Sequence, residues 1–422
     1  MASSREPCSS PRSNAPAALP FYEQALEDGS LAVPQRRAHA LDGRGLALLS
    51  LGRAAAAEAS GEAALALRRQ VGEPRGLGIT RNNLCFVLQA RGELSSLPAC
   101  YEEVIRLFEA AGLVRLEALV INNLGGVYER LGEPLEARRR YNRALDLLDD
   151  EATRARVLNN LGVVHRKMGE PGEALVHYTR ALDLFRAAGD RGWEARVLHN
   201  LATAYLTLGE PQRAATTLEQ ALALRRDLGD LRGVAYTLDS LGSARLELGE
   251  AQGAVASHRE ALELRRQLGD RRGEIASTSA LARTLLAAGD GEQGRELLAA
   301  ALPLAREEGD RELLARVLLS LGQASLAAGR DAEAAAAYTE ALSLAGELGH
   351  TQTRVAALSR LARLDHRAGR LDAALAGARE ALTAVHALRA AVPHVELRAS
   401  VLASYRELQE TRLAVLADLH RR

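Results

Sequence analysis

A row of asparagines is the feature of this sequence that could do specific chemistry. Asn83, Asn123, Asn160 and Asn200 follow one another at steps of 40, 37 and 40 residues. An asparagine side chain both donates and accepts hydrogen bonds, so such a row can hold the backbone of an extended peptide whatever side chains the peptide carries. We therefore predict that these four residues contribute to a peptide-binding groove.

Basic residues stand at positions that flank the asparagine row. They are Arg156, Arg166, Lys167, Arg196, Arg283, Arg316, Arg363 and Arg367. From this set we assign Arg156, Lys167, Arg196 and Arg316 to the predicted groove. A plainer interpretation stays open, in which the asparagines bond one another between neighbouring repeats and the arginines are ordinary solvated residues in a chain with 54 basic side chains.

No set of residues has the spacing of a catalytic or metal site. His165, His177, His199 and His258 fall at different repeat positions, and the sequence has no HExxH motif and no His/Cys pair at metal-ligand spacing. A GxxxxGK[ST] phosphate loop is absent, and no GxSxG motif stands out as a nucleophile elbow. We expect a protein that is not an enzyme and that takes no metal and no cofactor.

Charge and composition argue against nucleic acid and membranes as partners. Basic and acidic residues both number 54, so the formal net charge is zero, and aromatic residues make up only 3% of the chain. Nucleic-acid binders usually carry a basic surface and, for single strands, aromatic platforms. The first fourteen residues are polar, and no stretch approaches about 18 consecutive apolar residues. We expect a soluble, cytoplasmic protein.

The three cysteines, Cys8, Cys85 and Cys100, show no CxxC spacing and are odd in number. Such a set is typical of a reducing compartment, in which thiols serve as small core or tail residues. We therefore expect neither a disulfide nor a metal site.

Glycines divide the chain into segments of nearly equal length. One series is Gly52, Gly92, Gly132, Gly169, Gly209, Gly249, Gly289, Gly329 and Gly369, and the other is Gly72, Gly112, Gly189, Gly229, Gly269, Gly309 and Gly349. A fixed period in this range indicates a repeat array with two short helices per repeat. The one step of 37 residues predicts a loss of three residues in the loop near 149–151, and a groove that bends or tightens between Asn123 and Asn160.

Local signals mark where each helix begins and ends. In the Gly-Glu-Pro segments at 132–134, 169–171 and 209–211, glycine can end the first helix of a repeat and proline fits the first turn of the second helix. Aspartates that follow the second helix, as in Gly229-Asp230, can cap the next first helix. Each repeat is therefore expected to start and stop its own helices.

A third set of glycines lies inside the first helix of a repeat, where glycine costs roughly 1 kcal/mol relative to alanine. The set is Gly125, Gly162, Gly242 and Gly322, with Ala202, Ala282 and Ala362 at the matching places. Small residues at these places predict that the second helix of the same repeat approaches closely.

The pattern of Leu124-Gly125, Tyr128, Gly132, Ala137, Tyr141 and Ala144 recurs along the chain and resembles the tetratricopeptide repeat (TPR), with a period of 40 rather than about 34 residues. This resemblance implies an all-α fold, a right-handed superhelical solenoid of about nine helix-turn-helix repeats with a C-terminal capping helix. It also implies a peptide or protein ligand in the concave groove. We predict a disordered tail at 1–17, the solenoid at 18–390 and the capping helix at 391–422.

The segment from Leu388 to His420 is similar to the helical stretch that follows the TPRs in CHAT proteins, the caspase-like peptidases associated with TPRs. Its apolar stripe, which fits a capping helix, is Leu397, Val401, Tyr405, Leu408, Val415, Leu416 and Leu419. Three functions stay open. The first is a non-catalytic protein–protein interaction scaffold. The second is the sensor or regulatory arm of a bacterial CHAT-type protease system, whose peptidase domain would be a separate partner. The third is a peptide-sensing regulator of signalling or transcription.

Overall fold

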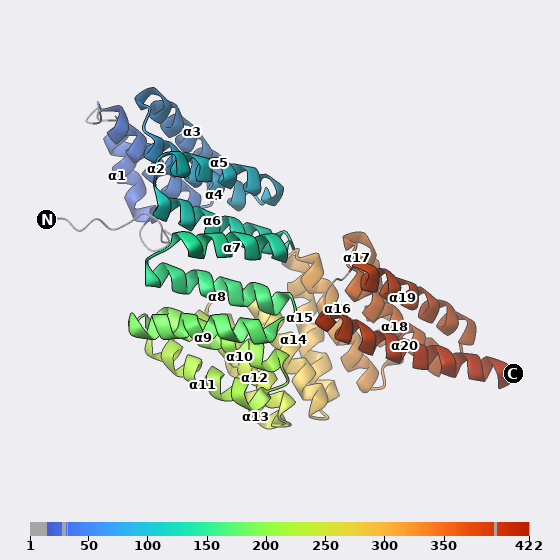
Figure 1. Ribbon diagram of the computed structural model, residues 1–422. Coiled ribbons are helices and arrows are strands. Elements are labelled where there is room, and N and C mark those ends of the chain that lie inside the picture. The colour runs from blue at the N-terminus through green and yellow to red at the C-terminus, as the bar shows by residue number, and fades with distance from the viewer. Residues whose placement is uncertain (1–14, 28–30, 32, 392–394, 422) are drawn as a thin grey trace. The chain divides into compact units, whose positions relative to one another are not determined.

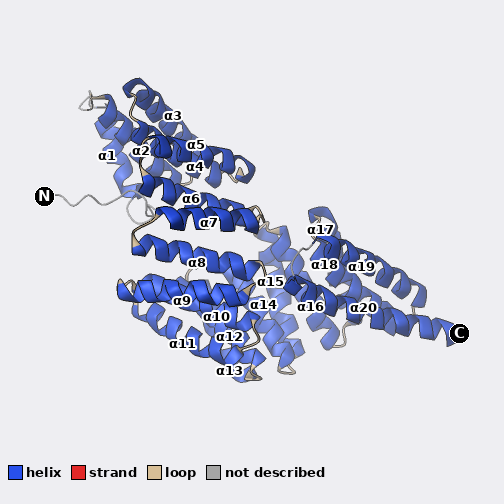
Figure 2. Ribbon diagram, in the orientation of Figure 1, coloured by secondary structure: helices blue, strands red, loops and turns tan. Residues whose placement is uncertain are grey.

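The computed structural model of the chain describes residues 15–27, 31, 33–391 and 395–421. These residues form α-helices joined by short turns, with one 3-10 helix at Leu94–Ser96 and no strand among them (Figure 2). None of the described helices combines the length and the apolar character needed to cross a bilayer. Of the predicted tail at 1–17, residues 1–14 lie outside the described residues, and the first helix begins at Ala15.

Twenty α-helices are described, and along the sequence eighteen of them, α2 to α19, alternate as the first and second helices of nine consecutive repeats (Figure 1). The first helices of the pairs, called A helices below, are α2 (Pro34–Ser50), α4 (Pro74–Ala90), α6 (Val114–Arg130), α8 (Glu151–Lys167), α10 (Arg191–Thr207), α12 (Leu231–Glu247), α14 (Arg271–Ala287), α16 (Arg311–Ala327) and α18 (Thr351–Arg367). The second helices, called B helices, are α3 (Ala54–Val71), α5 (Leu97–Ala110), α7 (Pro134–Leu147), α9 (Pro171–Ala187), α11 (Pro211–Asp227), α13 (Ala251–Gln267), α15 (Gly291–Glu307), α17 (Asp331–Leu348) and α19 (Leu371–Ala391). Helices α1 (Ala15–Glu27) and α20 (Val395–Arg421) flank them. The predicted all-α repeat fold is confirmed.

The chain divides into two compact units, Met1–Lys167 and Met168–Arg422, called the N-unit and the C-unit below. In the C-unit, each A helix of the series α10, α12, α14, α16 and α18 contacts the next, and in the N-unit α2 contacts α4 and α6 contacts α8. No two successive B helices of the described chain come into comparable contact. The A helices therefore form the inner face of each stack and the B helices its outer face.

The two glycine series end the helices as predicted. Every glycine of both series has a positive φ, the left-handed conformation that glycine adopts without steric cost. The side chains of Asp190, Asp230, Asp270 and Asp310 each accept a hydrogen bond from a backbone N–H in the first turn of the following A helix. Asp290 caps the B helix α15 in the same way. The repeat boundaries are thus set by local backbone chemistry.

The interior glycines of the A helices make room for a ring from the B helix. A Cβ atom added at Gly125, Gly242 or Gly322 would lie 2.5–2.6 Å from Tyr141, His258 or Tyr338, respectively. Where the A helix carries alanine instead, the B helix carries a residue without a ring. Ala202 shares a core cluster with Leu218, and Ala282 shares one with Leu298. The predicted close approach is confirmed at the three glycine positions.

The short repeat differs from its prediction in where the three residues are lost. Helix α7 has 14 residues, whereas the other B helices of the Gly-Glu-Pro repeats, α9 and α11, have 17, so the loss falls in the last turn of the helix rather than in the loop. Backbone carbonyls at the C-terminal end of α7 accept hydrogen bonds from a side chain of α8. Arg154 Nη1 donates to the carbonyls of Leu145 at 2.8 Å and Leu148 at 2.6 Å. A side chain here replaces the glycine that ends most other B helices.

The expectation that no cysteines pair is wrong. Cys85 on α4 and Cys100 on α5 form a disulfide, with their Cα atoms 5.9 Å apart. The two residues are 15 positions apart in sequence, and the antiparallel helix pair brings them face to face. Cys85 occupies the small-residue position that holds Gly125 in the next repeat. Short cysteine motifs cannot reveal such a pair, and the cysteine content no longer supports a reducing compartment. Cys8 lies outside the described residues.

Helix α20 packs on the last repeat, as predicted for a capping helix. Leu408 and Val415 are fully buried, and Val415 shares a core cluster with Leu371 and Ala374 of α19. His366 Nε2 on α18 lies 2.8 Å from Asp418 Oδ2 on α20. Leu416 is exposed. The side chains of Leu397, Val401 and Tyr405 lie outside the described part of the structure.

Candidate functional site

The asparagine row lies on the A helices, at half-buried positions of the inner face. Asn83, Asn123 and Asn160 belong to α4, α6 and α8 of the N-unit. Asn160 Nδ2 donates to Asn122 Oδ1 of the preceding repeat at 3.0 Å. The plainer interpretation, in which asparagines bond across repeats, therefore holds for Asn160 in this state of the molecule. Asn200 lies on α10 of the C-unit and is also half-buried.

The basic residues assigned to the groove differ in how their charges are balanced. In the N-unit, Lys167 Nζ lies 2.6 Å from Glu129 Oε1, so this lysine already has an acidic partner. Arg156 is half-buried on α8 and contributes to lowering the pKa of the Asp150 carboxyl. In the C-unit, Arg196 and Arg316 are exposed on α10 and α16.

Arg196 is held by an aromatic stack and not by an acid. Its guanidinium carbon lies 4.6 Å from the centre of the Trp193 ring, and the other neighbour of that ring is Phe185, whose ring centre is 5.2 Å away at an interplanar angle of 11°. A cation over an aromatic face is attracted by the ring quadrupole. Among the described residues, no acidic side chain lies within ion-pair distance of Arg196. The planar group is oriented while its N–H donors stay available.

An exposed ring lies on the next A helix. The Tyr236 side chain is 56% exposed, and its ring centre is 4.4 Å from that of His199 on α10. Ser240, one turn further along α12, is half-buried, as are Ala280 on α14 and Ser320 on α16 at the matching positions. The inner face of the C-unit thus has small side chains along its middle, beside an exposed tyrosine.

The inner face of the C-unit is basic. We define it as the exposed or half-buried positions 2, 6, 9 and 13 of its A helices, counted so that Leu201 and its equivalents are position 7. These positions hold one acidic residue, Glu247, and six arginines. The arginines are Arg196, Arg283, Arg316, Arg360, Arg363 and Arg367. Arg367 lies 3.6 Å from Asp331, whereas Arg283 and Arg316 have no ion pair within the described residues.

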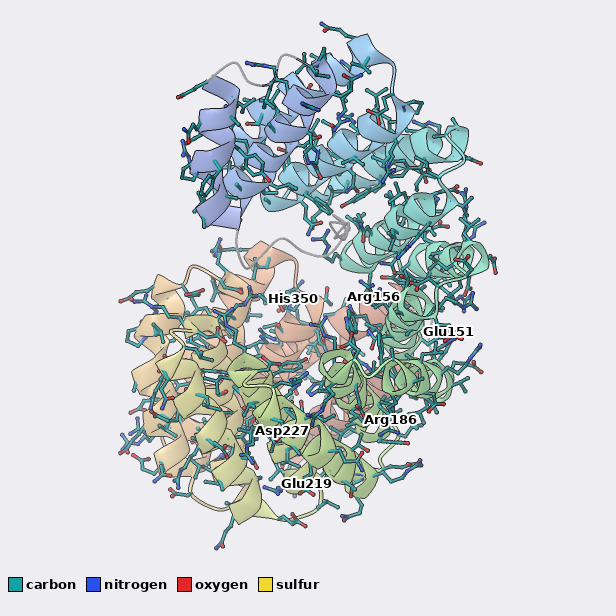
Figure 3. All side chains as sticks on the ribbon, turned by 90° about the vertical axis from the view of Figure 1, so that its left-hand side faces the viewer. Glu151, Arg156, Arg186, Glu219, Asp227 and His350 are labelled. Atoms are coloured by element: carbon teal, nitrogen blue, oxygen red, sulfur yellow. A yellow bond between two sulfur atoms is a disulfide. The ribbon has the colours of Figure 1, made fainter. Side chains whose placement is uncertain are left out.

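The outer face of the C-unit is different, because arginines of its B helices bind acids of the following B helix, as in the pairs of Arg226 with Glu260 and of Arg306 with Glu340. Three further pairs join the start of an A helix to the end of the B helix of the same repeat: Arg191 with Asp227, Arg271 with Glu307, and Arg311 with Glu347. Two acids of this face, Glu219 and Asp227, are labelled in Figure 3. A crevice of about 310 Å³ lies between α11, α12 and α13, with Leu222, Leu238 and Leu241 in its lining. Its lining also carries the ion pairs of Arg226 with Glu260 and of Arg245 with Glu219.

Two clusters of buried polar residues lie between repeats, and the sequence analysis did not predict them. Asp239 on α12 lies 2.7 Å from Arg265 Nη2 and 3.0 Å from His258 Nδ1, and it accepts a 2.8 Å bond from Ser277. The N-unit has a matching cluster of an aspartate, an arginine and a hydroxyl residue, in which Asp42 binds Arg68 at 2.9 Å and Thr80 at 3.0 Å.

The repeat register offers a signal for these clusters, since the two aspartates, the two arginines and the two hydroxyl residues are each 197 positions apart. Gly76 and Gly273 leave space for the arginines, because a Cβ there would lie within 2.8 Å of Arg68 or Arg265. Burial raises the pKa of the Asp42 carboxyl, although its bonds to Arg68 and Thr80 oppose the shift. These clusters hold neighbouring repeats together and do not face a ligand.

Within the described residues, no three His, Cys, Asp or Glu side chains gather where they could hold a metal ion. His165, His199 and His258 are buried, and each lies in a different environment of the helix stack. The exposed and half-buried polar side chains of the inner face make this face the candidate binding surface.

Stacked helix pairs with an accessible inner face define the class of helical-repeat scaffolds. A family model described as tetratricopeptide repeat matches residues 153–227 and 274–347, and a second model of the same description matches residues 237–272. These parts of the chain therefore consist of tetratricopeptide repeats. The matches end at residue 347, so the resemblance of residues 388–420 to CHAT proteins gains no support from them.

Solved structures share the fold at low sequence identity. The apo form of RapI is 16% identical, with a TM-score of 0.62, over 84% of this chain and 99% of that one. A Rap protein complexed with Competence and Sporulation Factor is 16% identical, with a TM-score of 0.51, over 79% and 99%. A STAND protein from Pyrococcus horikoshii, with a tetratricopeptide repeat sensor, is 14% identical, with a TM-score of 0.58, over 80% and 51%. No curated protein matches the sequence significantly.

Proposed function

We propose that the protein is a non-catalytic scaffold that binds an extended polypeptide segment along the inner face of its A helices. The observation that carries this proposal is the surface of the C-unit, where the A helices carry small side chains such as Ser240 and also Arg283 and Arg316, exposed arginines with no ion pair within the described residues. A ligand backbone can approach small side chains closely, while guanidinium groups bind its polar or acidic atoms.

The asparagine row has a supporting role in this proposal. Asn83, Asn123 and Asn160 would contribute in the N-unit and Asn200 in the C-unit, because each lies half-buried on an A helix and can bond a ligand amide. Arg156 and Lys167 flank the row in the N-unit. Asn160 would exchange its bond to Asn122 for one to the ligand, and Lys167 would compete between Glu129 and the ligand.

The structural relatives are compatible with this function. One Rap structure contains Competence and Sporulation Factor, and the Pyrococcus horikoshii protein is described as having a tetratricopeptide repeat sensor. The likeness to both concerns the fold. We extend ligand binding from them to this chain as part of the proposal, and the inner face of the A helices is the part of this chain suited to it.

Selection of displayed random peptides of twelve residues on the full chain tests the proposal. We expect peptides to be enriched, and we expect their affinity to be lost when Asn123, Asn160 and Asn200 are all replaced by alanine. The matched control is Asn142→Ala, which changes an exposed asparagine of the B helix α7. Helicity by far-ultraviolet circular dichroism should be equal in both variants. Failure to enrich any peptide contradicts the proposal, and full affinity in the triple variant removes the asparagine row from it.

A further inference from the structure

We infer that the ligand of the C-unit is an acidic extended segment, with a carboxylate at Arg196, an apolar side chain at Tyr236 and a second carboxylate at Arg316. This inference rests on the proposed function and adds the chemical class of the ligand. It starts from an imbalance, since the inner face defined above carries six arginines and one acidic residue, while the whole chain has a net charge of zero. Arg196, Arg283 and Arg316 of this face have no ion pair within the described residues, so anionic groups of a ligand can bind them.

Arg196 is the anchor of the site because it is already oriented. Its guanidinium lies over Trp193, which is itself stacked on Phe185, so little side-chain freedom remains to be lost on binding. A planar guanidinium can bind a carboxylate through two parallel N–H bonds. The acid nearest to it in sequence, Glu194, is already bound to Arg186 at 2.8 Å and does not compete.

The order of side chains on the A helices sets the pattern of the ligand. Arg196, Tyr236, Ala276 and Arg316 occupy the same helix position on α10, α12, α14 and α16, and each of these helices contacts the next. Packed helices are about 8–10 Å apart, so Arg196 and Arg316 are separated by roughly 24–30 Å. An extended chain covers this distance with about eight or nine residues. The apolar residue of the ligand then lies about three residues from the first carboxylate.

The uncharged parts of the face agree with a polypeptide ligand. Tyr236 is 56% exposed and offers an apolar surface between two arginines. Ala276 on α14 is exposed, and a small side chain there lets the ligand backbone lie close to the helix. A single-stranded nucleic acid is the other anionic polymer to consider, but it needs several stacking rings, and Tyr236 is the one large aromatic side chain at the inner-face positions of the C-unit.

The peptide selection described above separates this inference from the proposed function. We expect the enriched peptides to be rich in Asp and Glu, and we expect the Arg196→Gln/Arg316→Gln double variant to weaken their binding at least about tenfold. Arg196→Lys should lie between wild type and Arg196→Gln, because it keeps the charge but not the planar group. The control is Arg226→Gln on the outer face, where affinity should change less than about twofold.

Each other outcome overturns the inference in a recognisable way. Enriched peptides that are neutral or basic, and that still need the inner-face residues, contradict the acidic ligand and leave the proposed function standing. Enriched peptides that bind the Arg196→Gln/Arg316→Gln variant and the triple asparagine variant as tightly as wild type contradict both. A twelve-nucleotide single strand that binds more tightly than the acidic peptides, and that depends on the same arginines, replaces the polypeptide by a nucleic acid. Unchanged melting temperatures confirm that the variants fold.

Discussion

The inner and outer faces of the C-unit use the same residue type in opposite ways. On the outer face, arginines such as Arg226 and Arg306 reach the glutamates Glu260 and Glu340, which lie 34 residues further along the chain. On the inner face, Arg196 and Arg316 occupy matching places in their repeats and meet no acid. Exposed ion pairs add little stability, so the outer pairs chiefly neutralise the surface. Arg196 and Arg316, which have no acidic neighbour among the described residues, can therefore bind acidic groups of a ligand.

Arginines also occur buried between repeats, and there we expect a substitution to have its largest effect on stability. Asp239→Ala removes the partner of Arg265, whose side chain is only 10% exposed, and leaves that charge buried. We expect the free energy of unfolding, from urea titration of the full chain, to fall by about 3–5 kcal/mol. Glu260→Ala, which breaks an outer-face pair that is about half exposed, should cost less than about 1 kcal/mol. Equal losses would show that burial does not distinguish the two pairs.

The next effect concerns the packing layer that separates the two faces. A Cβ at Gly322 would lie 2.5 Å from the Tyr338 ring, so we expect Gly322→Ala to lower the free energy of unfolding by about 1–3 kcal/mol. Adding Tyr338→Leu should recover much of this loss, because the chain already packs Ala282 with Leu298. The measurement is a double-mutant cycle by urea unfolding.

The control for this cycle is a helical glycine with free space around it. A Cβ at Gly346 on α17 would meet no atom within 4 Å, so Gly346→Ala should stabilise the protein by about 0.5–1 kcal/mol. If Gly322→Ala also stabilised the protein, or if the losses of Gly322→Ala and Tyr338→Leu simply added, the account of the interior glycines would be wrong.

The smallest effect lies at the short repeat. Asp150 Oδ2 accepts a 2.9 Å bond from the Thr153 N–H at the start of α8, and hydrogen bonding to Thr153 is the main cause that lowers the pKa of this carboxyl. Asp150→Ala should cost about 1 kcal/mol at neutral pH. A lowered pKa in the folded state means that this contribution is present above about pH 4 and is lost as the pH falls through the folded-state value.

Stability measured against pH checks this assignment. The difference in unfolding free energy between wild type and Asp150→Ala should be constant between about pH 7 and pH 5 and should shrink below about pH 4. Asp149→Ala, at the exposed neighbour, is the matched control and should show no such difference. A difference that grows on acidification would contradict the cap.

The helix boundaries could be predicted from the sequence because they depend on local chemistry. Glycine at a helix end needs no partner far along the chain, and neither does a capping aspartate such as Asp230. The interior glycines were readable as close contacts for the same reason, since their cost in a helix requires an explanation. What fills the space was not readable, because Tyr141 and His258 lie sixteen residues away on another helix.

The parts that depend on side-chain geometry between helices could not be predicted. Cys85 on α4 and Cys100 on α5 form a disulfide between two consecutive helices, and no short sequence motif indicates such a pair. The repeat positions of Lys167 and Arg196 predict the same groove for both, yet Lys167 binds Glu129 of the preceding repeat, whereas Arg196 lies over a tryptophan ring. A basic side chain forms an ion pair only if an acidic side chain, often one from the adjacent repeat, lies within about 4 Å of it. The repeat pattern of the sequence does not predict this distance.

The most direct test of the central claim is where a bound peptide lies. A photo-crosslinking amino acid placed at Ser240, on the inner face of α12, should react with a selected and labelled peptide. The same amino acid at Thr216, exposed on the outer helix α11, should not. Crosslinking at Ser240 that unlabelled peptide suppresses is the result we predict. Crosslinking at Thr216 in place of Ser240 would contradict the assignment of ligand binding to the inner face of the A helices.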